Sequence, residues 1–467
     1  MNLCLNGNTL STTLDQGRQD LTLIAVYQDK TLNLCDCDAE GKGTLKTENN
    51  LTFGVEIWYP FTDGHTGGTF NMYGGTITGV QRGVRLYVES KGGKSTFKMY
   101  GGKITGTKRG VYVNDGSIFE MYGGEITNND TQPTLTENKE YFGGGVVVDI
   151  GATFTMHGGT ISNNKAYSGG GVCLLGKSGS ATTTFNMEGG TITGNTTTGG
   201  AGGGVYLGTN TAFNMSGDAT VSNNINNGNC GGGVYVNDSG SSFTMSGNST
   251  ISGNTAKFYG GGVNLAGGTF TMRENAAISG NNAGNGSYNG DGGGVCVNTG
   301  TFNMTGGSIT GNNVYLGSDA HDGEGGGGVY VARNATMNVS GNVQIHDNWK
   351  NGTKNDETGV YENGSANNLY LFAYETDKVL KTVTIDSTMG LASTAKIGVT
   401  TRYTPTASNP IKIATGATGA LSYYTQIFTP DVTDRGYTIT QTGENLYLSA
   451  HTHDWEYSVS AGNHTII

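Results

Sequence analysis

Three groups of side chains in this sequence have types and spacings suited to binding. The first is a column of rings, because Tyr or His follows the Met of four consecutive Phe-x-Met repeats. If the repeats stack as neighbouring strands, these rings lie about 5 Å apart on the outer surface. Sugars pack their CH faces against such rings; the alternative is an aromatic ladder that shields a strand end. The ring residues are Tyr73, Tyr100, Tyr122 and His157.

The second group is basic. Eight Lys and Arg residues lie within the 28 residues from Arg82 to Arg109, in a chain whose net charge is −11. These two arginines each precede a strand Val by two residues, so we expect them to be neighbours on adjacent coils. Stacked guanidinium groups repel one another unless an anion lies between them. That anion is either a nearby carboxylate, such as Glu137 or Glu140, or the acidic group of a glycan.

The third group lies in the long turns of the last repeats. These turns contain Tyr315, His321 and Trp349, which we expect to contact a ligand. Variable loops on one flank of a rigid scaffold are where recognition usually resides. The acidic residues Asp319 and Asp322 beside His321 could hold a divalent ion, but the Gly-rich surroundings predict mobility. We therefore assign neither a metal nor a cofactor.

No catalytic set can be assembled from spacing alone. Pectin-degrading hydrolases use a Gly-His-Gly and an adjacent pair of Asp, and Gly64-His65-Thr66 is the nearest match. We assign no catalytic residue. The alternative is a polysaccharide lyase or hydrolase with an unfamiliar site, in which Arg82, Arg109 and a nearby Tyr act on a uronate.

The elements that position these residues form a repeat. Phe-x-Met is followed after seven or eight residues by Ile or Val, and then by a Gly-rich approach to Val-x-Val. Apolar residues alternate within each segment, which is typical of strands. Repeat spacings of 22 to 35 residues indicate a solenoid with loop insertions. The sequence therefore predicts an all-β, right-handed parallel β-helix of about a dozen coils, with three strands in each coil.

An Asn follows the second-strand apolar residue by three positions in eight repeats. Stacked Asn side chains bond to the coils above and below, and Asn tolerates the left-handed backbone of a tight corner. We interpret this column as structural and not as a ligand site. Its members are Asn129, Asn164, Asn195, Asn224, Asn254, Asn281, Asn312 and Asn348.

Composition divides the chain into four parts. Residues 1–65 predict irregular coils, 66–371 regular coils, 372–449 a β-rich cap, and 450–467 the start of a truncated module. The 82 Gly residues occupy turn positions, where positive φ is needed. The acidic balance argues against nucleic-acid binding, and no apolar run reaches 18 residues, so we expect no membrane span. The chain opens on a strand pattern, so we expect an export signal and an anchor to be missing.

The six cysteines do not form a visible disulfide framework. Cys4, Cys35 and Cys37 lie close along the predicted axis, and one pair of them could form a bridge. Cys35-x-Cys37 is a weak metal signal because a second pair of cysteines is missing. Cys173 and Cys296 occupy an outward column, where we expect a thiol reagent to reach them.

The Thr-Phe-Asn-Met-x-Gly-Gly-Thr-Ile-Thr-Gly-Asn and Gly-Gly-Gly-Val-Tyr-Val units resemble those of parallel β-helix repeat proteins on bacterial cell surfaces. These proteins are adhesin-like members of the pectate-lyase-like group. The resemblance implies an exported, extracellular protein that binds glycans or host proteins along one flank. It implies little about chemistry, because the group contains lyases, hydrolases and binders. A passive surface stalk is a further alternative, and the oligomeric state stays open.

Overall fold

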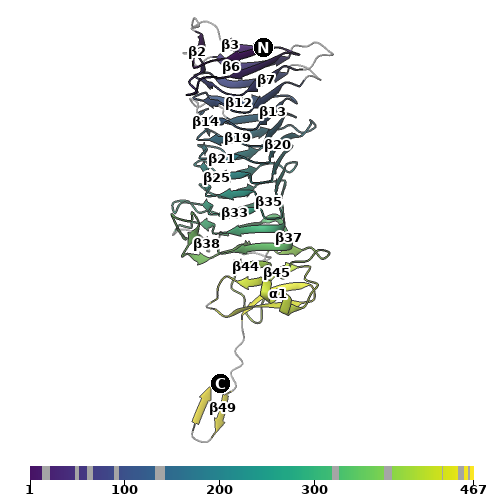
Figure 1. The fold of residues 1–467 in the computed structure, drawn as a ribbon. Helices are drawn as coiled ribbons and strands as arrows, with labels where there is room; N and C mark the ends of the chain where they lie inside the picture. The colour runs from purple at the N-terminus through teal and green to yellow at the C-terminus, as the bar shows by residue number, and fades with distance from the viewer. Residues whose placement is uncertain are drawn as a thin grey trace.

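A computed structural model describes most of the chain, whose strands stack into one long solenoid (Figure 1). The fold is all-β and parallel, with about 12 turns and a β-rich C-terminal region. This confirms the predicted fold class. The described residues are 1–12, 21–47, 52–59, 67–88, 94–131, 142–317, 325–372, 381–433, 435–450, 457–460 and 463–466.

Most regular coils contain the three separate strands that the repeat predicts, whereas β35 (Val295–Thr310) and β37 (Val329–His346) each join the corresponding segments into one strand. In one coil the three strands are β10 (Thr96–Met99), β11 (Lys103–Thr105) and β12 (Arg109–Val113). Each strand pairs in parallel with its equivalents in the two neighbouring coils, so that Phe97 aligns with Phe119 of the next coil. Like side chains therefore stack in columns along the axis.

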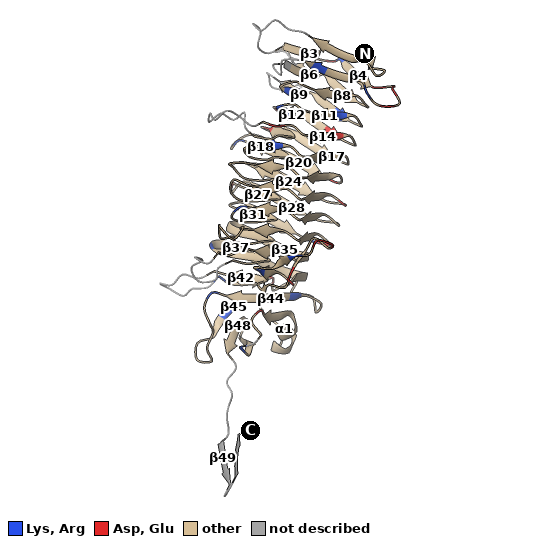
Figure 2. Ribbon diagram, turned by 90° about the vertical axis from the view of Figure 1, so that its left-hand side faces the viewer, with Lys and Arg blue, Asp and Glu red and all other residues tan. Residues whose placement is uncertain are grey.

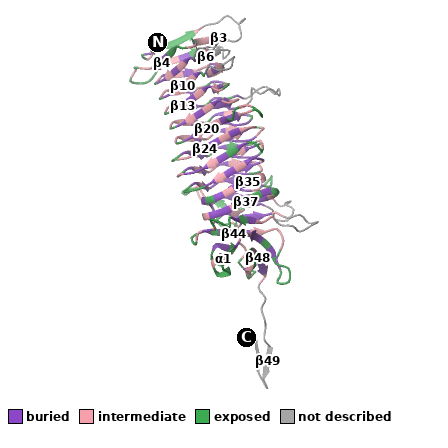
Figure 3. Ribbon diagram, turned by 90° about the vertical axis from the view of Figure 1, so that its right-hand side faces the viewer, coloured by how far each residue is buried: buried purple, intermediate pink, exposed green. Residues whose placement is uncertain are grey.

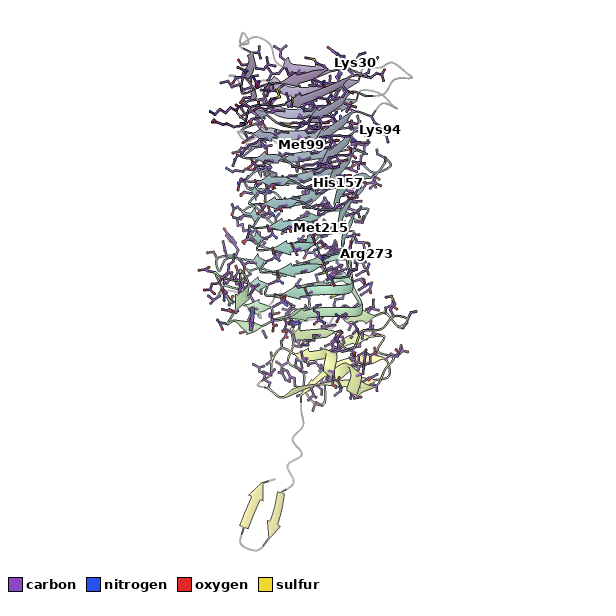
Figure 4. The ribbon with its side chains drawn as sticks, viewed as in Figure 1. Lys30, Lys94, Met99, His157, Met215 and Arg273 are labelled. Atoms are coloured by element: carbon purple, nitrogen blue, oxygen red, sulfur yellow. A yellow bond between two sulfur atoms is a disulfide. The ribbon has the colours of Figure 1, made fainter. Side chains whose placement is uncertain are left out.

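The inward columns of Phe, Met, Ile and Val fill the interior of the solenoid (Figure 3). The stacked rings from Phe70 to Phe302 have centroids 4.6 to 5.0 Å apart and are fully buried. Met99 and Met215 mark the neighbouring methionine column (Figure 4). A single coil would leave both sides of these columns in water, so the coils are stable only when stacked.

A fourth short strand, which the repeat pattern did not predict, follows the Asn corner in the middle and later coils. Seven such strands form a separate eight-stranded sheet with β41, which pairs antiparallel with β38. Each has two residues, which is too short for an alternating pattern to be visible in the sequence. They are β18 (Lys165–Ala166), β22 (Thr196–Thr197), β26 (Ile225–Asn226), β30 (Thr255–Ala256), β34 (Asn282–Ala283), β36 (Asn313–Val314), β38 (Trp349–Lys350) and β41 (Ser365–Ala366).

The eight predicted Asn residues form a continuous ladder with no exposed surface. Asn195 illustrates the pattern: its side-chain amide and its backbone N–H both donate to Oδ1 of Asn224, at 2.9 and 3.0 Å. The structural interpretation of the column is confirmed. The left-handed backbone, however, lies one residue before each ladder position, as at Asn163 (φ 55°) and Gly194 (φ 65°). That preceding residue makes the turn, which leaves the Asn side chain pointing inward.

The parallel stack continues beyond residue 371 before an antiparallel sheet closes it. β43 (Val383–Ile385) and β44 (Lys396–Thr401) still pair in parallel with β37 (Val329–His346). β48 (Asn445–Ala450) then pairs antiparallel with both β45 (Ile411–Thr415) and β47 (Tyr437–Thr442). The short helix α1 (Leu421–Ile427) contacts this sheet, and no helix in the described ranges is long and apolar enough to cross a membrane.

The prediction that Cys173 and Cys296 are reachable from solvent is wrong. Both side chains are fully buried, and burial raises the pKa of both thiols. They point away from the central core, but other residues cover them. A Cβ added to Gly169 would lie 2.7 Å from the Cβ of Cys173, which shows how closely the Gly-rich turn folds over this column. Cys296 packs with Tyr330 and Tyr370 in a second, smaller apolar cluster.

Candidate functional site

The four predicted ring residues form one stack on the outside of the N-terminal half of the solenoid. Neighbouring centroids are 4.9 Å apart from Tyr73 to Tyr100, 4.9 Å from Tyr100 to Tyr122, and 4.6 Å from Tyr122 to His157. The three tyrosines are 52%, 40% and 40% exposed. We call these four residues the ring column. Figure 4 labels His157 and, further along the rod, Arg273, which occupies the same repeat position.

The turn after the first strand holds each ring outside the core. The backbone N–H of Tyr100 donates to the carbonyl of Met72, 2.8 Å away, which fixes the residue at the end of the strand. A Gly-Gly pair follows, and its second member, Gly102, has φ 83°. A Cβ there would lie 2.7 Å from the carbonyl oxygen of Gly75, so the coils can approach only if this residue is Gly.

Ion pairs between neighbouring coils flank the ring column. Lys98 binds Glu120 at 2.8 Å on one side, and Lys103 binds Glu125 at 3.0 Å on the other. The hydrogen bond with Glu120 is the largest cause of a raised pKa at Lys98. At the lower end of the column, Nδ1 of His157 lies 2.8 Å from a carboxylate oxygen of Glu188.

Figure 2 shows these N-terminal charges against middle coils with few charged residues. Two of the eight clustered basic residues, Lys98 and Lys103, have a carboxylate partner beside the ring column. Arg85, a third member of that cluster, binds Glu56 at 3.0 Å. The basic sequence cluster thus does not form a uniformly positive surface.

The stacked arrangement changes what the ring column offers to a ligand. We expected free aromatic faces, but the tyrosine planes lie within 8° of parallel and cover one another. With ring atoms in contact at about 3.5–4 Å, a centroid distance of 4.9 Å requires a lateral offset of about 3 Å. Each ring therefore exposes its edge and a strip of one face. The accessible surface is a stepped ribbon of ring edges.

Arg82 and Arg109 are register neighbours, as predicted. Their guanidinium carbons lie 4.9 and 5.2 Å from the ring centroid of Tyr112, over the outer face of the third-strand sheet. Arg109 is only 5% exposed and donates to the carbonyl of Phe142 at 3.1 Å. The predicted carboxylate partners, Glu137 and Glu140, lie outside the described residues. The arginines and the ring column flank opposite ends of the second strand, so they do not make one continuous platform.

Tyr112 donates its hydroxyl to a carboxylate oxygen of Asp149 at 2.7 Å. Burial, together with this carboxylate, raises the pKa of Tyr112 well above its usual value. Burial also raises the pKa of Asp115, with a further contribution from Asp149. Burial and Asp149 keep the Tyr112 phenol protonated, against the opposite effect of the two arginines. Little phenolate is then present to act as a general base near neutral pH.

The third predicted group is only partly within the described ranges. Tyr315 is half-buried, donates its hydroxyl to the carbonyl of Gly352 at 3.2 Å, and lies 6.3 Å from the ring of Tyr361. Trp349 is half-buried in β38 and pairs with Ala366. His321 lies outside the described residues, as do its acidic neighbours from Asp319 to Glu324. This group therefore contributes two packed side chains and no defined site.

Two features were missed from the sequence. Glu188 occupies the same repeat position as the rings, so continuing the column by one coil would have identified the partner of His157. Lys257 lies 4.3 Å from the centroid of Tyr288, in a second exposed aromatic group with Phe258. These residues lie in turns of different length, and no fixed spacing connects them.

The sequence matches no protein-family model, and no curated protein or solved structure is significantly similar to it.

Proposed function

We propose that this chain is a surface-exposed, adhesin-like β-helix protein of a bacterium, which binds an extended glycan along the ring column. The observation that carries the proposal is the continuous ribbon of partly exposed rings from Tyr73 to His157. The fold itself requires no aromatic residue at this position, because Ser216 and Thr305 occupy it in later coils.

The spacing of the ring column suits a polymer that runs parallel to the solenoid axis. One ring is presented in each coil, about 4.8 Å from the next, and this interval is similar to the length of one sugar unit in an extended chain. The exposed ring edges and face strips offer apolar contact to CH groups. Phenol hydroxyls and the flanking Lys98 and Glu120 offer hydrogen bonds to sugar hydroxyls.

The ion pairs beside the column favour a neutral glycan over an acidic one. Lys98 and Lys103 each have a carboxylate within 3.0 Å, so an anionic sugar would have to compete with Glu120 and Glu125. A neutral chain avoids this competition. Binding should then change little with salt, because no ion pair forms between protein and ligand.

The lyase alternative receives less support from the arginine site. Its nearby tyrosine, Tyr112, is hydrogen-bonded to Asp149 and has a raised pKa, which opposes its use as the base. Arg109 is almost fully buried and has little surface to offer a polymer. A host-protein ligand or a passive stalk is a possible outcome of the binding test.

The test is retention of the purified chain on immobilised neutral and acidic polysaccharides at several salt concentrations. We expect retention on at least one neutral polymer, insensitive to salt. Tyr100→Ala should weaken that retention about tenfold, because the central ring contacts both neighbours and the ligand. Tyr100→Phe isolates the contribution of the hydroxyl.

Tyr167→Ala is the matched control, because Tyr167 is a similarly exposed tyrosine (46%) on a different turn. It should bind like the unchanged chain. Equal retention of Tyr100→Ala and the control would contradict the proposed platform. Absence of retention on every glycan would favour a protein ligand or a stalk.

A further inference from the structure

Three cysteine sulfurs meet at the N-terminal end of the solenoid, directly above the ring column. β1 (Asn2–Cys4) pairs in parallel with β4 (Thr31–Cys35), which places Cys4 opposite Cys35 on the next coil. Cys37 follows two residues later and forms a disulfide with Cys4. The predicted bridge within this group is thus present, but it leaves a third thiol, Cys35, beside it.

The three sulfurs form a compact triangle. Sγ of Cys35 lies 3.9 Å from Sγ of Cys37, and all three sulfurs lie within 4.8 Å of one another. Attack of Cys35 on the disulfide requires the three atoms to be in line. A collinear arrangement would place the outer sulfurs about 6 Å apart, given a bond of about 2 Å. The observed triangle is therefore poorly arranged for disulfide exchange.

The triangle suits three ligands around a common centre. A tetrahedral thiolate site with metal–sulfur bonds of about 2.3 Å places its sulfurs about 3.8 Å apart, close to the 3.9 Å between Cys35 and Cys37. The Cα atoms of Cys4 and Cys37 are 6.3 Å apart, so the two sulfurs can separate by side-chain rotation once their bond is broken.

The turn that carries Cys37 is fixed independently of the sulfurs. Asp36 accepts backbone N–H groups from Gly7 at 2.8 Å and from Gly43 at 2.6 Å, one on each carboxylate oxygen. These bonds hold the turn against both neighbouring segments of chain. They also occupy both oxygens of the carboxylate that lies between Cys35 and Cys37 in the sequence, and we expect a fourth ligand to come from solvent.

We propose that the reduced form of this cluster is a binding site for one thiophilic metal ion, with Zn²⁺ as the expected class. A dithiol reductant supplies two electrons and two protons to the Cys4–Cys37 disulfide, which yields two thiols. The three thiols then lose three protons as their sulfurs bind the ion, and water takes the fourth position. Disulfide formation and metal binding exclude one another. This inference is independent of the proposed glycan binding.

The experiment uses the full chain, reduced with a phosphine and freed of reductant under anaerobic conditions, and titrated with Co²⁺. Co²⁺ substitutes for Zn²⁺ and gives thiolate-to-metal absorption. We expect one equivalent to bind, Zn²⁺ to displace it, and the oxidised chain to bind none. Zn²⁺ should also protect three thiols from alkylation, which is a readout independent of the spectrum.

Cys35→Ser is the decisive variant, because it retains the disulfide and therefore the oxidised fold. After reduction it should bind Co²⁺ about 100-fold more weakly, because one of three ligands is lost. Cys230→Ser removes a buried thiol elsewhere and should leave binding unchanged. The proposal is overturned if the reduced chain shows no thiolate absorption, or if Cys35→Ser binds as tightly as the Cys230→Ser control.

Discussion

The two ends of the second strand carry two side-chain columns that differ in almost every physical respect. At one end, Asn occupies eight successive coils and is fully buried. At the other end, the corresponding column changes from Tyr to His to Glu188 and then to Ser216, and it is largely exposed. The same backbone repeat thus determines the residue type only at the buried corner. The fold does not require a run of four rings at the solvent-exposed corner.

Hydrogen bonding explains the difference. Each ladder Asn accepts the backbone N–H and the side-chain N–H of the previous coil, groups that would otherwise be buried without partners. The ladder begins at Thr107, whose hydroxyl and backbone N–H donate to Asn129, and it ends at Asp431. A tyrosine in the exposed column satisfies no such buried group, and its ring stabilises the fold by stacking on its neighbours.

The largest effect should therefore come from breaking the ladder in its middle. Asn224→Ala removes the acceptor shared by the backbone N–H and the side-chain amide of Asn195, and it removes the donor to the carbonyl of Ile192. At about 1–3 kcal/mol for each buried unsatisfied group, we expect a loss of about 3–5 kcal/mol in unfolding free energy. Denaturant unfolding and hydrogen exchange of the flanking coils measure it.

Ser252→Ala is the control for this substitution, because Ser252 is a half-buried surface residue of the second strand. Its unfolding free energy should stay within about 0.5 kcal/mol of the unchanged chain. Similar losses in both variants would show that the ladder has no special role.

The end of the ladder predicts a pH dependence. Asp431 accepts from the backbone and side chain of Asn368 and from the hydroxyl of Thr400, and burial raises its pKa above the ordinary 3.8. A carboxyl with a raised pKa binds its proton more tightly in the folded chain. The stability that this bound proton provides is therefore fully present below the pKa of Asp431 in the unfolded chain. It is lost as the pH rises through the pKa of Asp431 in the folded chain.

Asp431→Asn removes this titration and leaves every other carboxyl in place. We expect the unfolding midpoint of the unchanged chain to fall relative to that of the variant as pH rises from about 3 to about 7. A constant difference between the two chains across that range would contradict a raised pKa at Asp431. Parallel thermal melts in the same buffers provide the measurement.

The two columns also show what the sequence could and could not predict. A regular repeat fixes which residues share a column, so the Asn ladder, the stacked rings and the Arg82–Arg109 pair were all found by counting positions. Counting gives no ring orientation, so it did not reveal that the tyrosines cover one another. It also placed the left-handed residue one position too late, because both Asn163 and Asn164 tolerate that conformation.

Errors concentrate where turn length varies. Cys173 lies in an outward column, but the Gly-rich turn of its own coil folds over it, and nothing in the strand pattern predicts that path. The closeness of Cys4, Cys35 and Cys37 was predicted, but which two of them bond depends on how the turn from Cys35 to Gly43 approaches Gly7. Contacts of this kind arise from irregular chain between repeats, which has no periodic signal.

A smaller effect is expected when a ring is removed from the exposed column. Tyr100→Ala loses two stacked contacts, each worth about 0.5–1.5 kcal/mol, so unfolding free energy should fall by about 1–3 kcal/mol. The middle of this range is about half of that expected for Asn224→Ala. Denaturant unfolding of both variants under one set of conditions tests the ratio. A larger loss from Tyr100→Ala would mean that the rings are a structural ladder.

The smallest change in stability should come from extending the ring column by one coil. Glu188 makes the same backbone hydrogen bond as the ring-column residues, because its N–H donates to the carbonyl of Met156 at 2.9 Å. Its side chain is 54% exposed. Glu188→Tyr exchanges an exposed polar contact with His157, worth about 0–1 kcal/mol, for a stack on the same ring, worth about 0.5–1.5 kcal/mol. Its unfolding free energy should therefore differ by less than about 1 kcal/mol from that of the unchanged chain.

The same exchange at the buried corner, Asn195→Tyr, should prevent folding, because a phenol does not fit between fully buried coils. If the ring column binds a glycan, the Glu188→Tyr variant should also be retained more strongly than the unchanged chain. The comparison uses the same immobilised polysaccharide on which Tyr100→Ala is retained more weakly. Retention that does not change, in a chain that folds normally, would place the ligand away from the lower end of the column. If Glu188→Tyr instead lowered the unfolding free energy strongly, the exposed corner would be as restrictive as the buried corner in the side chains that it accommodates.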